Sequence, residues 1–188
     1  LTECTPCNFH TYSKFSGGTT CVACPAGYTL DNTGGSECLE CSAGKYGIIG
    51  SERSLTPGAC TLCEIGQYRA STGAIGENLT SCVACAAGMH QSLPGQASCL
   101  PCIPGRANSL SKQSECTKCE VNAFANTTKH IVCKNCKVGQ FTNGNKGSAD
   151  CQRCPAGTAG SGCAYCPPGK YRGNTDDAKT CIDCLPGL

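Results

Sequence analysis

The sequence predicts small disulfide-rich repeats, stacked as an elongated, all-β and largely irregular rod of cysteine-rich modules. The first observation behind this prediction is that 22 of the 188 residues are cysteine, a share typical of disulfide scaffolds in secreted chains. The second is that every cysteine belongs to a C-x-x-C pair. The third is a shortage of large apolar residues, with no Trp and one Met. Such a chain cannot offset the conformational entropy of folding by apolar burial, so the cysteines are expected to hold the fold.

The same cysteines indicate where the protein works. Disulfides persist in oxidising compartments, so we expect an extracellular or cell-surface location. No stretch of the sequence approaches the roughly 20 apolar residues that cross a membrane. The repeat pattern begins and ends within a repeat, and we therefore expect residues 4–188 to be a fragment of a longer repetitive chain.

Internal repetition dominates the sequence, as in other repeat proteins. The eleven C-x-x-C pairs are separated by steps of 17, 17, 22, 22, 17, 17, 17, 18, 12 and 18 residues. We name each repeat by its opening cysteine and count positions from that residue, so that position 3 is the second cysteine. The repeats open at Cys4, Cys21, Cys38, Cys60, Cys82, Cys99, Cys116, Cys133, Cys151, Cys163 and Cys181.

Two further positions recur inside the repeats. Position 6 is glycine except at His10 and Asn122. Because Asn is the residue after Gly that most readily adopts positive φ, Asn122 suggests a left-handed backbone there, whereas His10 weakens this rule. Position 8 is often aromatic, and we expect it to be a strand residue packed over the neighbouring disulfide. The alternative is an exposed aromatic ladder that binds sugars or a partner. The aromatic residues at position 8 are Tyr12, Tyr46, Tyr68, Phe124, Phe141 and Tyr171.

The number of pairs constrains the disulfide connectivity, although sequence alone does not fix it. Eleven pairs cannot be grouped two by two into closed modules. A ladder fits better, in which position 3 of each repeat bonds to the opening cysteine of the next, and it leaves Cys4 and Cys184 without a partner in this segment. The predicted bonds are Cys7–Cys21, Cys24–Cys38, Cys41–Cys60, Cys63–Cys82, Cys85–Cys99, Cys102–Cys116, Cys119–Cys133, Cys136–Cys151, Cys154–Cys163 and Cys166–Cys181.

The unit C-x-x-C-P-A-G, at residues 21–27 and 151–157, resembles the cysteine-rich repeats of ciliate surface antigens, the immobilisation antigens. It also resembles the related ephrin-receptor-like repeats of eukaryotes. The loop between pairs is similar to the first disulfide loop of tumour necrosis factor receptor modules, which supports the ladder. The resemblance implies a glycosylated coat on a protist cell or cilium, commonly lipid-anchored. The unequal steps of 12 and 22 residues depart from the regular family pattern.

Other chemistry is less favoured by the sequence. The spacing of the C-x-x-C pairs is compatible with zinc sites that have four cysteine ligands. The odd number of pairs and the short step after Cys151 disfavour such sites. A redox role needs a helix N-terminus at the cysteine pair, which the Pro- and Gly-rich repeats do not supply. His10, His90 and His130 are scattered and are expected in surface loops, and Asp176-Asp177 is expected in a solvated turn. We expect no enzyme activity, no metal, no cofactor and no nucleic-acid partner.

Two sequons, at Asn78 and Asn126, fall in the polar return of their repeats. Both meet the N-glycosylation rule, and we expect N-glycans there.

Charge divides unevenly along the chain. Residues 1–90 hold 4 Lys/Arg against 7 Asp/Glu, a balance of −3, and residues 91–188 hold 11 against 6, a balance of +5. This asymmetry favours a solvated surface, with an end-to-end dipole or a polyanion-binding patch as the functional alternative.

The leading prediction is a structural component of an extracellular coat or filament. The possible partners are copies of this chain or flanking repeats. The alternative is a receptor or adhesion ectodomain that binds a protein or glycan ligand.

Overall fold

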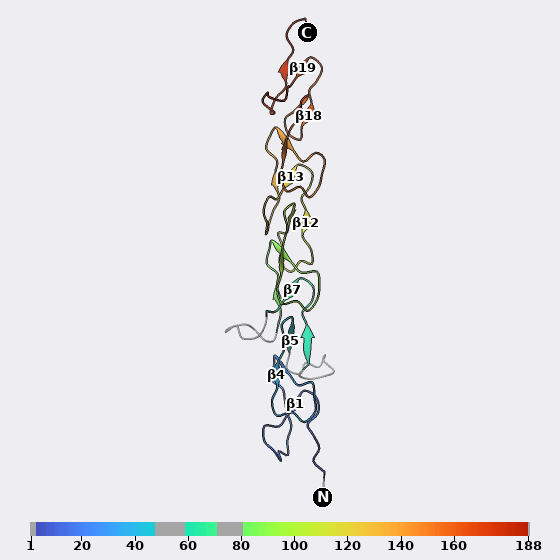
Figure 1. Cartoon of the computed structure of the whole chain (residues 1–188), viewed down its shortest axis with the longest axis vertical. Coiled ribbons are helices and arrows are strands. Elements are labelled where there is room, and N and C mark those ends of the chain that lie inside the picture. The colour runs from blue at the N-terminus through green and yellow to red at the C-terminus, as the bar shows by residue number, and fades with distance from the viewer. Residues whose placement is uncertain (1–2, 48–58, 71–80, 188) are drawn as a thin grey trace. The chain divides into compact units, whose positions relative to one another are not determined.

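A computed structural model describes residues 3–47, 59–70 and 81–187 of the chain. These residues form twenty short strands in ten two-stranded sheets, and they contain no helix (Figure 1). The prediction of an all-β fold of small disulfide-rich repeats is therefore confirmed.

Each sheet joins the strand around positions 7 and 8 of one repeat to the strand around positions 1 and 2 of the next. Most strands are two residues long because the flanking glycine turn and cysteine pair end them. In chain order the strands are β1 (Thr11–Tyr12), β2 (Val22–Ala23), β3 (Tyr28–Thr29), β4 (Leu39–Glu40), β5 (Lys45–Gly47), β6 (Cys60–Leu62), β7 (Gln67–Tyr68), β8 (Val83–Ala84), β9 (Met89–His90), β10 (Leu100–Pro101), β11 (Arg106–Ala107), β12 (Thr117–Lys118), β13 (Ala123–Phe124), β14 (Lys134–Asn135), β15 (Gln140–Phe141), β16 (Gln152–Arg153), β17 (Thr158–Ala159), β18 (Ala164–Tyr165), β19 (Lys170–Tyr171) and β20 (Ile182–Asp183).

Ten disulfides connect the repeats, and they join the same cysteines as the ladder drawn from the sequence. Their Cα–Cα distances run from 5.3 Å in Cys154–Cys163 to 5.8 Å in Cys166–Cys181. Cys4 is exposed and Cys184 is half-buried, and neither forms a disulfide. The remaining bonds are Cys7–Cys21, Cys24–Cys38, Cys41–Cys60, Cys63–Cys82, Cys85–Cys99, Cys102–Cys116, Cys119–Cys133 and Cys136–Cys151.

The chain divides into two compact units. The first comprises Leu1–Cys85, Gln91–Leu100 and Lys112–Ser114, and the second comprises Ala86–His90, Pro101–Ser111 and Glu115–Leu188. Each of the ten disulfides lies within one of these units. The same local pattern of bonds recurs in both units, so the description below applies to each unit separately.

A tight turn at position 6 shapes every repeat that the structure describes. In the ten repeats that open at Cys4 to Cys163, the N–H of position 7 donates to the carbonyl of position 4, as from Tyr28 to Pro25 at 3.1 Å. The residue at position 6 has a positive φ, which a type II turn requires at its third residue. His10 and Asn122 also adopt it, with φ of 61° and 63°. The sequence suggests that His10 is an exception to the left-handed backbone at position 6. The structure shows that it is not an exception.

Backbone hydrogen bonds tie each repeat to the next. The N–H of position 3 donates to the carbonyl of position 6 in the preceding repeat, as from Cys41 to Gly27 at 2.8 Å and from Cys154 to Gly139 at 2.9 Å. The N–H of position 6 in turn donates to the carbonyl of position 9 in the following repeat, as from Gly105 to Ala125 at 2.8 Å. These bonds use main-chain atoms, so they recur despite wide variation in side chains.

The buried core is made mainly of cysteines, of position 9 and of a few small residues. Position 3 is buried in most repeats, with Cys41, Cys63, Cys85 and Cys102 fully inaccessible. The aromatic residues at position 8 do lie in strands, as expected, but they are half-buried, and Tyr171 is exposed. The interior therefore consists mainly of disulfides, of the residue that follows the aromatic position and of small alanines such as Ala123 and Ala159.

Candidate functional site

Position 9 carries an unexpected feature, a series of buried polar side chains. Because the position 8 strand residue faces outward, the next residue turns inward beside the disulfide. Leu30 and Ala125 make this position apolar in two repeats, Gly47 and Gly160 occupy it in two more, and elsewhere it is polar. Buried polar groups must be hydrogen-bonded to avoid a large desolvation cost. The polar residues buried at this position are Arg69, Gln91, Asn108, Thr142 and Arg172.

Arg69 is 2% exposed and binds the preceding repeat. Its Nη1 donates to the carbonyl of Cys41 at 3.0 Å and also to the carbonyl of Lys45. Its Nη2 lies 3.3 Å from Glu40 Oε1, an ion pair that offsets the buried charge. Glu40 is at position 2 of the Cys38 repeat, so a carboxylate from the neighbouring strand supplies the counter-charge.

Arg172 is also 2% exposed and repeats this arrangement without a carboxylate partner. Its guanidinium donates to the carbonyls of Cys154, Pro155 and Thr158. Cys154 and Thr158 occupy positions 3 and 7, the positions that Arg69 reaches through Cys41 and Lys45. The two arginines therefore perform the same task, holding the carbonyls of the preceding repeat.

The carbonyl at position 3 is bonded in one of two ways. In five repeats it accepts a backbone N–H from a left-handed residue near position 13 of the next repeat, for example from Lys129 to Cys102 at 2.9 Å. In two others, at Cys41 and Cys154, it accepts an arginine N–H. The five backbone donors are Gly34, Gly95, Lys112, Lys129 and Gly147.

Asn108 and Gln91 show two uses of an amide at position 9. Asn108 Nδ2 donates to the carbonyl of Met89 at 3.0 Å, the position 7 carbonyl of the preceding repeat. Gln91 instead closes its own loop, because its Nε2 donates to the carbonyl of Ser98 at 2.8 Å and its Oε1 accepts the N–H of Leu93 at 3.1 Å. The sequence did not predict that polar side chains at position 9 are buried and bind neighbouring carbonyls. The only signal was that polar residues recur directly after the aromatic position.

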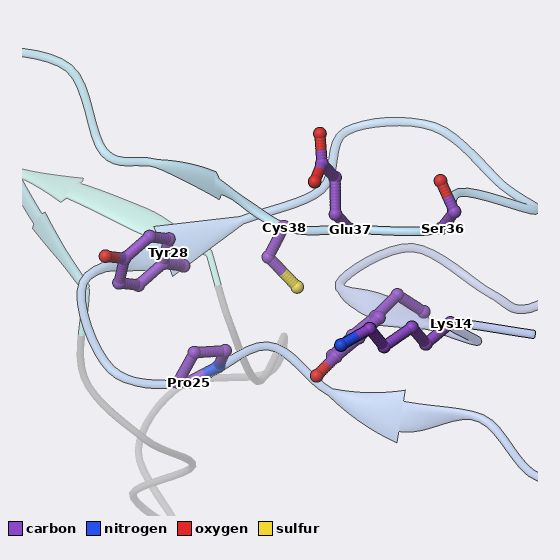
Figure 2. A pocket seen from close by; sticks show the side chains of 7 residues that line it. Lys14, Pro25, Tyr28, Ser36, Glu37 and Cys38 are labelled. Carbon is purple, nitrogen blue, oxygen red and sulfur yellow. The ribbon is translucent and has the colours of Figure 1, made fainter.

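The first compact unit has a surface hollow of about 420 Å³. Tyr12 from β1 and Tyr28 from β3 line it, together with Lys14 and Pro25. Figure 2 shows Tyr28 and Pro25 on one side, Lys14 on the other and the Cys38 sulfur between them. Two aromatic rings beside polar groups could bind a small apolar surface and fix its orientation by hydrogen bonds.

The sequon residues differ in what the structure shows. Asn126 is exposed, and its Oδ1 lies 3.2 Å from His130 Nε2. Its placement in a polar return is therefore compatible with the expected glycan, which stays a prediction. Asn78 lies outside the described residues.

One of the three histidines differs from expectation, whereas the other two and the aspartates match it. His90 lies in strand β9 rather than in a loop, and His10 replaces the turn glycine and bonds Thr29 Oγ1 at 3.0 Å. All three histidines are half-buried. Asp176 Oδ2 accepts the N–H of Gly173 at 2.7 Å, and Asp177 Oδ1 accepts the N–H of Lys179, as in a solvated turn.

The disulfides exclude zinc binding by the twenty cysteines that they join, because their sulfurs are not free thiolates. Within residues 3–47, 59–70 and 81–187, no group of three or more His, Cys, Asp or Glu side chains could hold a metal ion. None of these segments forms a helix long and apolar enough to cross a lipid bilayer.

Comparison with models of protein families and with curated proteins found no match to this chain. Function must therefore be inferred from the repeat geometry and from the surface of the two units.

Proposed function

We propose that the chain is an extracellular structural protein, a component of a cell-surface or ciliary coat or filament. The observation that carries this proposal is the bonding between successive repeats. One disulfide and the same backbone hydrogen bond from position 3 to position 6 recur ten times along the chain. Such a chain is reinforced covalently in every repeat and depends little on its exposed side chains.

The oxidised cysteines support the extracellular part of the proposal. Ten disulfides are compatible with an extracellular or secreted protein, since cytosolic thiols are kept reduced. The resemblance of the C-x-x-C-P-A-G unit to ciliate surface antigens points the same way, and it is the reason for proposing a protist coat. In this role the protein provides spacing and cover and carries out no catalysis.

The natural partners of such a structure are further repeats. Each disulfide joins position 3 of one repeat to the first cysteine of the next, and Cys184 and Cys4 occupy these two positions without a partner. Repeats of another copy or of the same polypeptide could therefore continue the ladder. The acidic residues 1–90 and basic residues 91–188 would also be complementary in a head-to-tail contact.

The proposal is tested in two steps. An antibody raised against the oxidised chain should label intact cells of the source organism, and mild external protease should remove the label. Light scattering of the purified chain should show association that weakens with added salt, because surface charges are screened over about 8 Å at physiological ionic strength. Signal only after permeabilisation would reject the surface location, and a monomer at both salt concentrations would reject self-assembly.

The second candidate is a receptor or adhesion ectodomain that binds a protein or glycan. The hollow beside Tyr12 favours it, because aromatic side chains with a nearby cation form a small recognition surface. A matched pair of variants tests it. Tyr12 pairs with Val22 across β1 and β2, and Tyr68 pairs with Val83 across β7 and β8. If the hollow binds a ligand on a glycan array, Tyr12→Ala should abolish the signal and Tyr68→Ala should retain it.

A further inference from the structure

A second hollow, of about 400 Å³, lies in the second compact unit, and its lining includes three basic residues beside Val138, Gly139 and Ala178. Lys137 enters it from the turn before β15. Gln140 and Arg153 enter from β15 and β16, where they are cross-strand partners. Lys179 and Asp177 enter from the loop that follows Arg172. Pockets that hold small ligands begin at about 300 Å³, so this hollow has room for one anionic sugar residue.

The lining cations are largely unneutralised. Among the residues that the structure describes, Lys137 and Lys179 make no ion pair, whereas other lysines, such as Lys146 with Glu120 at 2.7 Å, do. Arg153 donates to the backbone carbonyl of Asp176 rather than to a carboxylate. Lys137 and Lys179 are both exposed, so their ammonium groups are free to reach a ligand.

Arg172 supplies a further positive charge beneath this loop. It is almost fully buried, and every acceptor of its guanidinium is a backbone carbonyl. One of these, the Asp176 carbonyl, is shared with Arg153, which places the buried charge next to the hollow. A buried charge is costly unless an opposite charge lies near it.

The acidic groups nearby offset only part of this charge. Asp176 and Asp177 each direct a carboxylate oxygen to a backbone N–H of their own loop, at Gly173 and Lys179. Lys137, Arg153, Arg172 and Lys179 contribute four positive charges and the two aspartates two negative ones, which leaves a local balance of +2. The arrangement therefore favours a bound anion.

We propose that this hollow binds a sulfate group of an acidic extracellular glycan, with Lys137, Arg153 and Lys179 as its direct contacts and Arg172 as a buried supporting charge. Charge-assisted hydrogen bonds from these three side chains to sulfate oxygens would be stronger than neutral ones. The choice of a glycan over other polyanions rests on the extracellular location proposed above, whereas the anion site itself rests only on the charges and the hollow.

The test uses the oxidised chain and an immobilised heparin-derived octasaccharide, with binding measured by surface plasmon resonance. The double variant Lys137→Gln with Lys179→Gln should weaken binding by at least about tenfold, because two charge-assisted contacts are lost. The matched control, Lys129→Gln with Lys134→Gln, removes the same charge from exposed lysines outside the hollow and should weaken binding by no more than about threefold. Because the measurement uses purified protein, it does not depend on whether the chain forms a coat.

Four outcomes would overturn the proposal. No binding of the parent chain to the octasaccharide would show that the hollow does not hold a sulfated glycan. Equal losses in the two double variants would leave only diffuse surface charge. Equal binding of the desulfated octasaccharide would show that sulfate is not recognised. Tighter binding of a DNA oligonucleotide that depends on the same two lysines would move the site to a phosphate polymer, and the assignment to a glycan would fail.

Discussion

At the scale of single residues, glycine at position 6 is required for two separate reasons, a positive φ and the lack of space for a Cβ atom. Gly105 has φ +83°, and a Cβ atom there would lie 2.0 Å from the carbonyl oxygen of Gly147, two repeats later. Gly157 has φ +78° but meets nothing within 4 Å. The first glycine is thus required by both conformation and close backbone approach, and the second by conformation alone.

This difference predicts unequal costs for the same substitution. Gly157→Ala should destabilise the oxidised chain by about 1 kcal/mol, the cost of a left-handed residue with a Cβ. Gly105→Ala should cost about 2–4 kcal/mol, because a backbone carbonyl must also move. Thermal unfolding of the two variants, followed by circular dichroism under non-reducing conditions, compares them. Equal shifts in Tm would show that the close approach to Gly147 does not constrain the fold.

The buried arginine at position 9 gives a second prediction. Arg172→Met should destabilise the second unit by about 2–4 kcal/mol, since the carbonyls of Cys154 and Thr158 would lose a buried donor. Lys170→Met removes an exposed ion pair with Asp183 at 2.8 Å and should change stability by less than about 1 kcal/mol. Hydrogen exchange at the amides of residues 157–172 should report the loss, and similar protection in both variants would argue against a structural role for Arg172.

The exposed sequon gives a third prediction. Asn126 in a polar return should carry an N-glycan when the chain is secreted from a eukaryotic cell, because its side chain is exposed. Intact-mass spectrometry before and after N-glycan removal should show a mass decrease that disappears in Asn126→Gln. A Thr128→Ala variant removes the sequon but keeps the asparagine and serves as the control. An unchanged mass in the parent chain would remove this support for a glycosylated surface.

The cysteines and turn glycines could be predicted from sequence because their requirement is the same in every repeat. A disulfide needs two cysteines, and the left-handed turn at position 6 takes glycine in most repeats, so the residue type indicates the geometry there, whereas the left-handed Lys112 and Lys129 carry no such signal. Position 9 could not be predicted, since burial beside the disulfide is met by Leu30, Arg69 or Gln91 with different chemistry. The hollows were also beyond sequence reasoning, because they gather residues from several repeats.

At the scale of elements, the strands are too short to be stable by themselves. An isolated two-stranded hairpin is at best marginal in water, and most strands here have two residues. Their persistence depends on the disulfide at one end of each sheet and on the hydrogen bonds that reach the neighbouring repeats. The energetic unit is therefore the junction between repeats rather than the sheet.

Removing one disulfide should consequently unfold the chain locally. Cys136→Ser with Cys151→Ser opens a loop that contributes about 3 kcal/mol in the chain-entropy model. Repeats interact mainly with their neighbours. Amide protection should therefore fall near Gly139 and Cys154, where the N–H of Cys154 donates to the carbonyl of Gly139 at 2.9 Å, and it should persist at Cys119. Hydrogen exchange with mass spectrometry resolves the two regions. A uniform loss across residues 101–187 would show that the second unit unfolds as one cooperative body.

At the scale of the whole molecule, the disulfides replace a hydrophobic core. The buried apolar residues of the described segments are mostly cysteine and alanine, with Leu30 as the largest aliphatic side chain. Many larger apolar side chains, such as Phe15 at 76% exposure, lie at the surface. Apolar burial of about 25 cal/mol per Å² is therefore available only in small amounts, and cross-linking must supply most of the stability.

Full reduction should therefore unfold the whole chain, whereas metal chelation should leave it intact. Ten bonds of about 3 kcal/mol each exceed the net stability of about 5–15 kcal/mol that is typical of a domain. Circular dichroism and limited proteolysis after complete reduction should show loss of both structure and protease resistance. The same measurements with a chelator and no reductant are the control. If structure survives reduction, the backbone bonds between repeats suffice without the disulfides, and if the chelator alone unfolds the chain, a metal contributes to its stability.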